Sequence, residues 1–286
     1  MSRRKKRKQS FKGWLPSKAE EDVSPGGEAR RRSGGRWKWI AALTVLAVAI
    51  PGAAVSAFLL LPRSGEPSGP PRAAIVDQLG LTFPNPEFVQ EATATLEQAG
   101  HVVDYFPGEQ VTVDLYRSLP ERDYDYLIFR VHTAQFDKEW RGKPYNEPVL
   151  FTSEPYSATE YIGEQWEMQL NPAFVSEGAP KYFAVAANFI ESGMSGQFDD
   201  ATVILMGCGS LQTERTAEAF VNKGADAVVG WSDLVSTTHT DAVTQLLLSK
   251  LIVEGLPVEA AVAQTMSELG PDPAYKSVLQ FYPSQG

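Results

Sequence analysis

Residues 202–231, TVILMGCGSLQTERTAEAFVNKGADAVVGW, decide the fold that the sequence predicts. The apolar, β-branched run at residues 202–206 indicates a strand that is buried on both faces. A polar turn follows, then apolar residues at helical spacing, and Gly224 marks the end of that helix. A second apolar run at residues 226–230 indicates the next strand. This unit places Cys208, the one cysteine of the chain, at the carboxyl end of a strand, where parallel sheets hold ligands and catalytic groups.

The same alternation of strands and helices extends over residues 72–286 and predicts an α/β domain in three layers, with a mostly parallel sheet in the middle. Further strands are expected at residues 73–79, 101–106, 126–131, 182–187 and 277–282, and further helices at 86–100, 111–119, 240–254 and 258–269. Residues 134–180 interrupt the pattern with a segment rich in Tyr, Trp, Glu and Pro. We expect a strand at residues 148–152 and a short helix at 158–170 within it, and few hairpin turns in the body. Such a long insertion is more often functional than idle.

The amino terminus predicts a membrane anchor. Residues 39–61 hold no charged side chain, and these 23 residues are enough to cross a bilayer as a helix. We therefore predict a disordered basic cytoplasmic tail at residues 1–36, a transmembrane helix at 37–61 and a Pro/Gly/Ser linker at 62–71. The positive-inside rule then makes this a single-pass plasma membrane protein whose carboxyl-terminal domain is extracytoplasmic. A cleaved signal peptide is the alternative, and the long basic region favours the uncleaved anchor.

The distribution of charge excludes several classes of partner. Residues 1–61 carry 13 Lys and Arg against 4 Asp and Glu, whereas the rest of the chain carries 13 against 31. Because the rest of the chain is so acidic, we do not expect it to bind nucleic acid. The basic tail is typical of segments that contact anionic lipid. No phosphate-binding loop and no metal-ligand spacing occur in the sequence, so we expect neither a cofactor nor a metal.

Two strand ends carry residues that suit nucleophilic catalysis. His132 ends one apolar run just as Cys208 follows another, and neighbouring parallel strands would bring both residues to the same edge within reach of proton transfer. A thiol in water is only a few per cent ionised at pH 7, so a base of this kind is needed to activate it. Gly207 and Gly209 leave the turn around the cysteine open, so that backbone N–H groups can approach a substrate oxyanion.

Structural explanations compete with these roles. A lone cysteine is more often a small core residue, and a histidine at the end of a strand is more often a structural one. His101 begins its strand and should lie at the opposite edge of the sheet, whereas His239 precedes a helix and can reach the edge of Cys208. The sequence therefore leaves His239 open as the base in place of His132.

The order of these parts resembles the caspase-like cysteine peptidases, the superfamily of caspases, metacaspases, clostripain, gingipains and CHAT domains. In that family a histidine follows the third core strand and a cysteine follows the fourth; here LIFRVH ends at His132 and VILMGC ends at Cys208. The later pattern AEAFVNKGADAVVGW, followed by LLLSKLIVEGLPVEAAVAQTM, is similar to CHAT and gingipain-type domains. The resemblance covers roughly residues 72–282.

The resemblance implies a hydrolase that cleaves peptide bonds in a peptide or protein substrate. Cys208 would be the nucleophile and His132 the general base, and N–H groups of Cys208 or Gly209 would help to form the oxyanion hole. In the family a glycine after the histidine also donates its N–H, and Thr133 holds that position here. A second hypothesis is an inactive caspase-like ectodomain that binds a partner through the aromatic, acidic insertion.

Overall fold

The structure is a computed structural model that describes residues 69–283. The predicted tail, the predicted membrane span at residues 37–61 and most of the predicted linker lie outside the described residues. Within residues 69–283, no helix is long and apolar enough to cross a membrane.

The centre of the domain is a six-stranded sheet in the order β10-β9-β8-β3-β1-β2. All of its neighbouring strands pair in parallel except β10, which runs antiparallel to β9 at one edge. Its strands are β1 (Arg72–Asp77), β2 (Val102–Pro107), β3 (Tyr126–Phe129), β8 (Thr202–Leu205), β9 (Ala227–Trp231) and β10 (Leu279–Pro283). Every residue of β8 and β9 is buried, as their continuous apolar runs predict. The predicted α/β fold with a mostly parallel sheet is confirmed.

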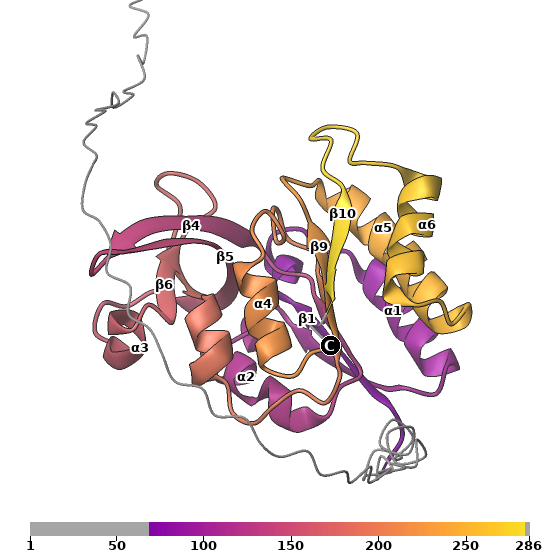
Figure 1. The fold of residues 1–286 in the computed structure, drawn as a ribbon, viewed down its shortest axis with the longest axis horizontal. Coiled ribbons are helices and arrows are strands. Elements are labelled where there is room, and N and C mark those ends of the chain that lie inside the picture. Colours follow the sequence, from indigo (N-terminus) through magenta and orange to yellow (C-terminus); the bar gives the residue numbers. More distant parts are fainter. Residues whose placement is uncertain (1–68, 284–286) are drawn as a thin grey trace, which may run out of the picture. The chain divides into compact units, whose positions relative to one another are not determined.

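Helices cover both faces of this sheet (Figure 1). One face carries α1 (Pro86–Gln98), α5 (Thr237–Leu248) and α6 (Val258–Leu269), and the other carries α2 (Val113–Ser118) and α4 (Arg215–Asn222). Phe88 and Leu247 belong to the core on the first face, whereas Tyr116 and Phe220 belong to the core on the second. Short helical turns complete the connections: η1 (Gln78–Leu81), η2 (Gly108–Gln110), η3 (Leu119–Arg122), η4 (Phe189–Gly193) and η5 (Ser249–Val253).

The start of α1 is fixed by its own sequence. The Asn85 side chain accepts a hydrogen bond from the Phe88 N–H at 3.2 Å and so caps the helix. Pro86 occupies the first turn, where its missing N–H costs nothing. Asn85 therefore marks the end of the loop that connects β1 to α1.

The insertion forms a second, antiparallel sheet in the order β4-β5-β7-β6. Its strands are β4 (Thr133–Trp140), β5 (Lys143–Pro155), β6 (Leu170–Ala173) and β7 (Tyr182–Val185). The expectation of few hairpins was wrong here, because β4 and β5 make a long one. Its two-residue turn places Arg141 at φ 52° and Gly142 at φ 73°, the left-handed geometry that such turns require. The pair Arg-Gly, unlike Asn-Gly, is not a typical turn sequence.

The helix expected at residues 158–170 is much shorter than predicted. Only α3 (Ile162–Trp166) forms, and none of its residues is buried. The chain leaves the helix through Met168, which has a φ of 58°, and enters β6 at Leu170. Leu170, the last residue of the predicted helix, is instead a buried residue of β6.

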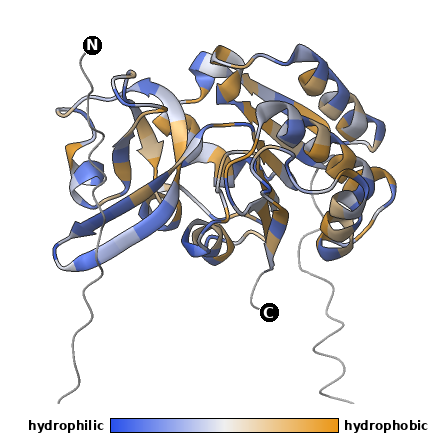
Figure 2. Ribbon diagram, turned by 90° about the horizontal axis from the view of Figure 1, so that it is seen from above, coloured by the Kyte–Doolittle hydropathy of each residue, from blue (hydrophilic) through white to orange (hydrophobic). Residues whose placement is uncertain are grey.

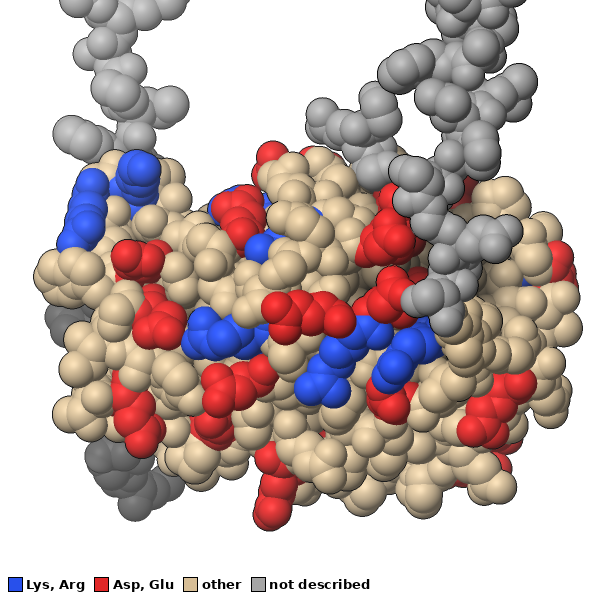
Figure 3. Space-filling view, turned by 90° about the horizontal axis from the view of Figure 1, so that it is seen from below, with Lys and Arg blue, Asp and Glu red and all other residues tan. Residues whose placement is uncertain are grey.

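The surface is mixed in charge and hydropathy. Hydrophilic residues line much of the β4–β5 hairpin, and hydrophobic residues concentrate in the strands and the inner sides of the helices (Figure 2). On the face drawn in Figure 3, basic side chains lie among acidic ones. Arg117 pairs with Glu164 at 3.2 Å and Arg215 pairs with Glu191 at 2.5 Å. The basic side chains of these pairs are therefore neutralised locally.

Candidate active site

Cys208 lies in a tight turn directly after β8, at the carboxyl edge of the larger sheet. A side chain on Gly207 would place its Cβ 2.6 Å from the backbone oxygen of Val131, so only glycine fits there. Gly209 has a φ of 59°, which also favours glycine. The Cys208 side chain is half-buried, and its thiol donates to the Val235 carbonyl oxygen at 3.5 Å.

His132 lies at the same edge, directly after β3. Its Nε2 is 3.2 Å from the Thr82 hydroxyl oxygen, and its ring packs against Phe83 and Phe151 with centroid separations of 6.0 and 5.7 Å. Its backbone N–H donates to the side-chain oxygen of Gln78 at 3.0 Å. Burial lowers the pKa of His132. The ring is therefore neutral at pH 7 and able to accept a proton.

The sheet brings the two residues to adjacent positions. β3 and β8 are neighbouring parallel strands, and Phe129 pairs with Leu205 at their ends. His132 and Cys208 each follow three residues later, so both lie at the carboxyl edge of the sheet, beyond the last paired residues. The Thr133 hydroxyl donates to the Cys208 carbonyl oxygen, which holds the two chain segments together.

Both side chains belong to the same face of the sheet. Side chains alternate along extended chain, so His132 shares its face with Arg130, which forms an ion pair with a carboxylate of α5. Cys208 lies in the turn, and it packs with Met206 against the core beneath α1, α5 and α6. No hydrogen bond joins the thiol to the His132 ring in the part of the chain that the structure describes.

The backbone N–H of Thr133 does not pair with β5. Phe151 N–H donates to the His132 carbonyl oxygen, which makes Thr133 and Leu150 a pair without mutual hydrogen bonds. The N–H of Thr133 therefore points away from β5. Because β4 is the edge strand of its sheet, this N–H is not used in the pairing of the sheet.

The backbone N–H of Gly209 is engaged elsewhere. It donates to the Asp233 carbonyl oxygen at 2.8 Å, in the loop after β9. This hydrogen bond occupies the N–H of Gly209, which the resemblance implies as an oxyanion donor.

The other two histidines have structural surroundings. His101 precedes β2 at the amino edge of the sheet, and its ring packs on Tyr126 at 5.4 Å. His239 lies in the first turn of α5, which begins near the carboxyl edge, and its ring packs on Trp231 at 5.6 Å. His239 is therefore the nearer alternative to His132 as a base.

Residues beyond the predicted ones surround His132. Thr82 and Gln78 contact it from a loop that lies 50 and 54 residues earlier in the chain, a separation that no local pattern reveals. One signal was present in the sequence: Arg130 is a charged residue inside an apolar strand, which requires buried partners.

No protein-family model matches this sequence, and no curated protein matches it either. Within residues 69–283, no group of three or more His, Cys, Asp or Glu side chains is placed to hold a metal ion. The carboxyl edge of the larger sheet, which holds Cys208 and His132, is the candidate site.

Proposed function

We propose that residues 72–286 form a caspase-like, three-layer cysteine peptidase domain that cleaves peptide bonds with a dyad of Cys208 and His132. The observation that carries the proposal is their placement three residues beyond the paired ends of β3 and β8, at the carboxyl edge of the sheet. In chain order these are the third and fourth strands of the larger sheet. This is the order of histidine and cysteine that the resemblance implies.

In the first half of the reaction, His132 takes the thiol proton of Cys208. The thiolate then attacks the scissile carbonyl carbon, so that a C–S bond forms and the carbonyl becomes an oxyanion. The N–H groups of Thr133 and Cys208 stabilise this charge. As the oxyanion collapses, the C–N bond breaks, His132 returns the proton to the leaving amine, and a thioester remains. The thiol must leave the Val235 carbonyl oxygen for this step.

In the second half, water resolves the thioester. His132 removes a proton from the water molecule, the hydroxide adds to the thioester carbonyl, and the C–S bond breaks. The departing thiolate of Cys208 takes up the proton from His132. The products are a carboxylic acid and the original thiol, so no redox partner is needed.

We further propose that residues 37–61 anchor the domain as a single membrane span, with the tail at residues 1–36 cytoplasmic. The support is the uncharged run of 23 residues at 39–61 and the excess of basic residues before it. The substrates would then be extracytoplasmic peptides or proteins.

A second candidate function is a binding module without catalysis. The insertion exposes Trp166 by 58% and Ile162 by 65%. The Trp166 ring packs on Trp140 at 5.4 Å and lies 4.7 Å beneath the Arg141 guanidinium. Trp140 is half-buried, so Trp166 is the exposed member of this aromatic pair, and exposed tryptophan is typical of contact surfaces for protein partners. This function predicts that Cys208→Ala leaves partner binding intact and that Trp166→Ala abolishes it.

Labelling of the single cysteine tests the dyad. The full-length chain, held in detergent micelles, is treated with a peptidyl acyloxymethyl ketone, and the rate of adduct formation is followed by mass spectrometry. If His132 activates the thiol, His132→Ala slows labelling by about 10²–10⁴-fold, the usual contribution of a general base. His101→Ala, at the opposite edge of the sheet, is the matched control and should label like the wild type.

The dyad is overturned if the wild type and His132→Ala are labelled at equal rates, and if these rates match the rate at which glutathione reacts with the same reagent. If His239→Ala slows labelling and His132→Ala does not, the base is His239. Cleavage of a peptide library by the wild type, and its loss in Cys208→Ala, then separates a peptidase from a reactive but non-hydrolytic thiol.

A further inference from the structure

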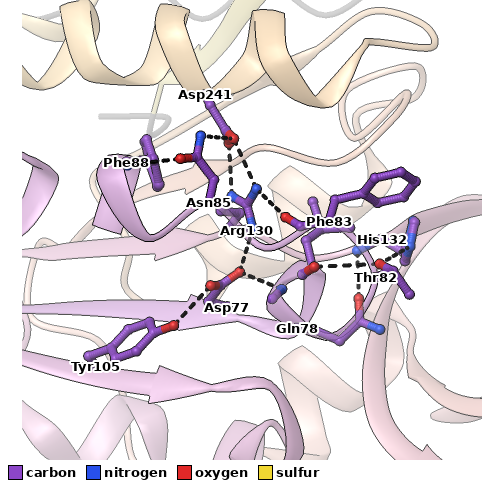
Figure 4. A network of polar contacts seen from close by, with 12 residues as sticks. Asp77, Gln78, Thr82, Phe83, Asn85, Phe88, Tyr105, Arg130, His132 and Asp241 are labelled. Atoms are coloured by element: carbon purple, nitrogen blue, oxygen red, sulfur yellow. Dashed lines mark hydrogen bonds and ion pairs between the residues drawn. The ribbon is translucent and has the colours of Figure 1, made fainter. Parts of the chain in front are cut away.

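Behind His132 lies a fully buried cluster of charges centred on Arg130 (Figure 4). Arg130 is 0% exposed. Its Nε and Nη2 donate to the two carboxylate oxygens of Asp241 at 2.8 and 2.9 Å, and its Nη1 donates to Asp77 at 2.8 Å. One guanidinium thus joins the end of β1, the end of β3 and the helix α5.

The same cluster holds the loop between β1 and α1. Arg130 Nη2 also donates to the Phe83 carbonyl oxygen at 2.8 Å. Asp77 accepts the Gly80 N–H at 2.9 Å, and Asp241 accepts the side-chain N–H of Asn85 at 2.9 Å. The loop is therefore fixed near its start, at its middle and at its end.

Besides this cluster, a backbone turn holds the loop: the N–H groups of Thr82 and Phe83 donate to the Leu79 carbonyl oxygen at 3.0 and 2.6 Å. Phe83 is 48% exposed, and Thr82 is also exposed, so apolar burial contributes little to their position. Both nevertheless touch the His132 ring: the Thr82 hydroxyl oxygen lies 3.2 Å from Nε2, and the Phe83 ring meets the imidazole edge to face at 69°. Figure 4 shows the loop between the Arg130 cluster and the imidazole.

The contact with Thr82 couples the ring proton to the Thr82 hydroxyl. When this hydroxyl donates to the Leu79 carbonyl oxygen, 3.5 Å away, its lone pairs accept the Nε2–H of His132, 3.2 Å away. That assignment leaves Nδ1 unprotonated, which is the form that accepts a proton from a thiol. Thr82 thus serves as the group that orients a catalytic base.

A buried ion pair is weak support for stability, because the loss of hydration offsets much of the attraction, and its best-attested role is to fix one arrangement. We propose that Arg130 is a positioning residue for His132: it clamps the loop from Gly80 to Asn85 so that Thr82 holds the ring in the tautomer with its proton on Nε2. The effect of Arg130 on catalysis rests on the proposed function, whereas its effect on the ring does not.

The first measurement is the tautomer itself. Long-range ¹H–¹⁵N spectra of the full-length chain in detergent micelles report which nitrogen carries the proton, and His132→Gln identifies the signal among the three histidines of the chain. We expect Nε2–H in the wild type and a mixture of tautomers in Thr82→Val and in Arg130→Lys. Arg130→Lys keeps the charge but lacks the fork that reaches two carboxylates and Phe83 together.

The second measurement is the labelling rate of Cys208. Thr82→Val and Arg130→Lys should each slow it by roughly 10–100-fold, the range for groups that orient a functional histidine. The double variant should be no slower than the slower single variant, because both act through the same contact. Arg215→Lys, which alters an ion pair on another part of the domain, is the matched control and should behave like the wild type.

Two results would overturn the proposal: an unchanged tautomer in a folded Arg130→Lys, or effects of the two substitutions that multiply. If Arg130→Lys fails to fold, Asn85→Ser replaces it, since serine keeps the cap on α1 and loses the donor to Asp241. If labelling proves independent of His132, the proposed dyad fails, and the tautomer measurement still decides whether Arg130 positions the ring.

Discussion

The close approach of the two strand ends makes Gly207→Ala a sharp test of the site. The added Cβ would lie 2.6 Å from the Val131 carbonyl oxygen and 2.6 Å from Cγ2 of Thr133. Ordinary contact begins at 3.4 Å, so one segment must move by about 0.8 Å. The backbone oxygen cannot rotate away, and overpacking of this kind destabilises a fold by about 1–3 kcal/mol.

Thermal unfolding measures the effect. For a domain of this size, 1 kcal/mol lowers Tm by about 2–4 °C, so we expect Gly207→Ala to lower it by about 2–12 °C. Gly163→Ala is the matched control, because nothing lies within 4 Å of its Cβ in α3. Alanine in place of a helical glycine should leave Tm unchanged or raise it slightly.

The same variant tests whether the dyad depends on this contact. A displacement of about 1 Å at a reacting group costs roughly 10²-fold in rate, so labelling of Cys208 should slow to a comparable extent. Thr133→Ser removes Cγ2 while keeping the hydroxyl that donates to Cys208, and the double variant should recover part of the lost Tm. An unchanged Tm in Gly207→Ala would refute the close approach, and a lowered Tm with normal labelling would refute its link to the site.

Two further predictions concern acid stability and the membrane. Burial raises the pKa of Asp272, but hydrogen bonds from the hydroxyl and N–H of Ser236 and from the N–H groups of Tyr275 and Ala274 outweigh it and bring the pKa to about 2. The depressed pKa stabilises the fold above about pH 4, and this stabilisation is lost as the pH falls to about 2. The free energy of unfolding of Asp272→Asn, followed by circular dichroism, should therefore decrease less steeply between about pH 4 and about pH 2 than that of the wild type. Equal slopes of this free energy against pH in the two proteins would contradict the prediction. The run at residues 37–61 should keep the full-length chain in the membrane pellet after carbonate extraction, whereas release into the supernatant would exclude a span.

The sequence was informative where structure follows from local patterns. The unit at residues 202–231 forms a strand, helix and strand as predicted, because its apolar periodicity and its glycines act over short distances. Helix α6 (Val258–Leu269) begins and ends where its pattern does. The placement of Cys208 and His132 at one edge also followed, since parallel strands end at the same side of a sheet.

Features that depend on distant partners were not predictable. The Arg130 guanidinium meets Asp77 and Asp241 across 53 and 111 residues, and no periodicity encodes those pairings. The β4–β5 hairpin was missed because Arg141 adopts a left-handed conformation without a typical turn sequence. The antiparallel direction of β10 depends on its pairing with β9, which the apolar run of the strand does not specify.

The pairing of β3 with β8 affects the order in which the chain can fold during synthesis. His132 is synthesised 76 residues before Cys208, an interval of roughly 4–15 s at about 5–20 residues per second. During that time β1, β2 and β3 are able to pair with one another, and the whole second sheet is made, before the strand that carries the thiol exists. A nascent chain therefore holds His132 before Cys208 exists, and β8 joins β3 before β9 and β10 can extend the sheet. The pairing of β8 with β3 is thus the event that brings the two residues to one edge.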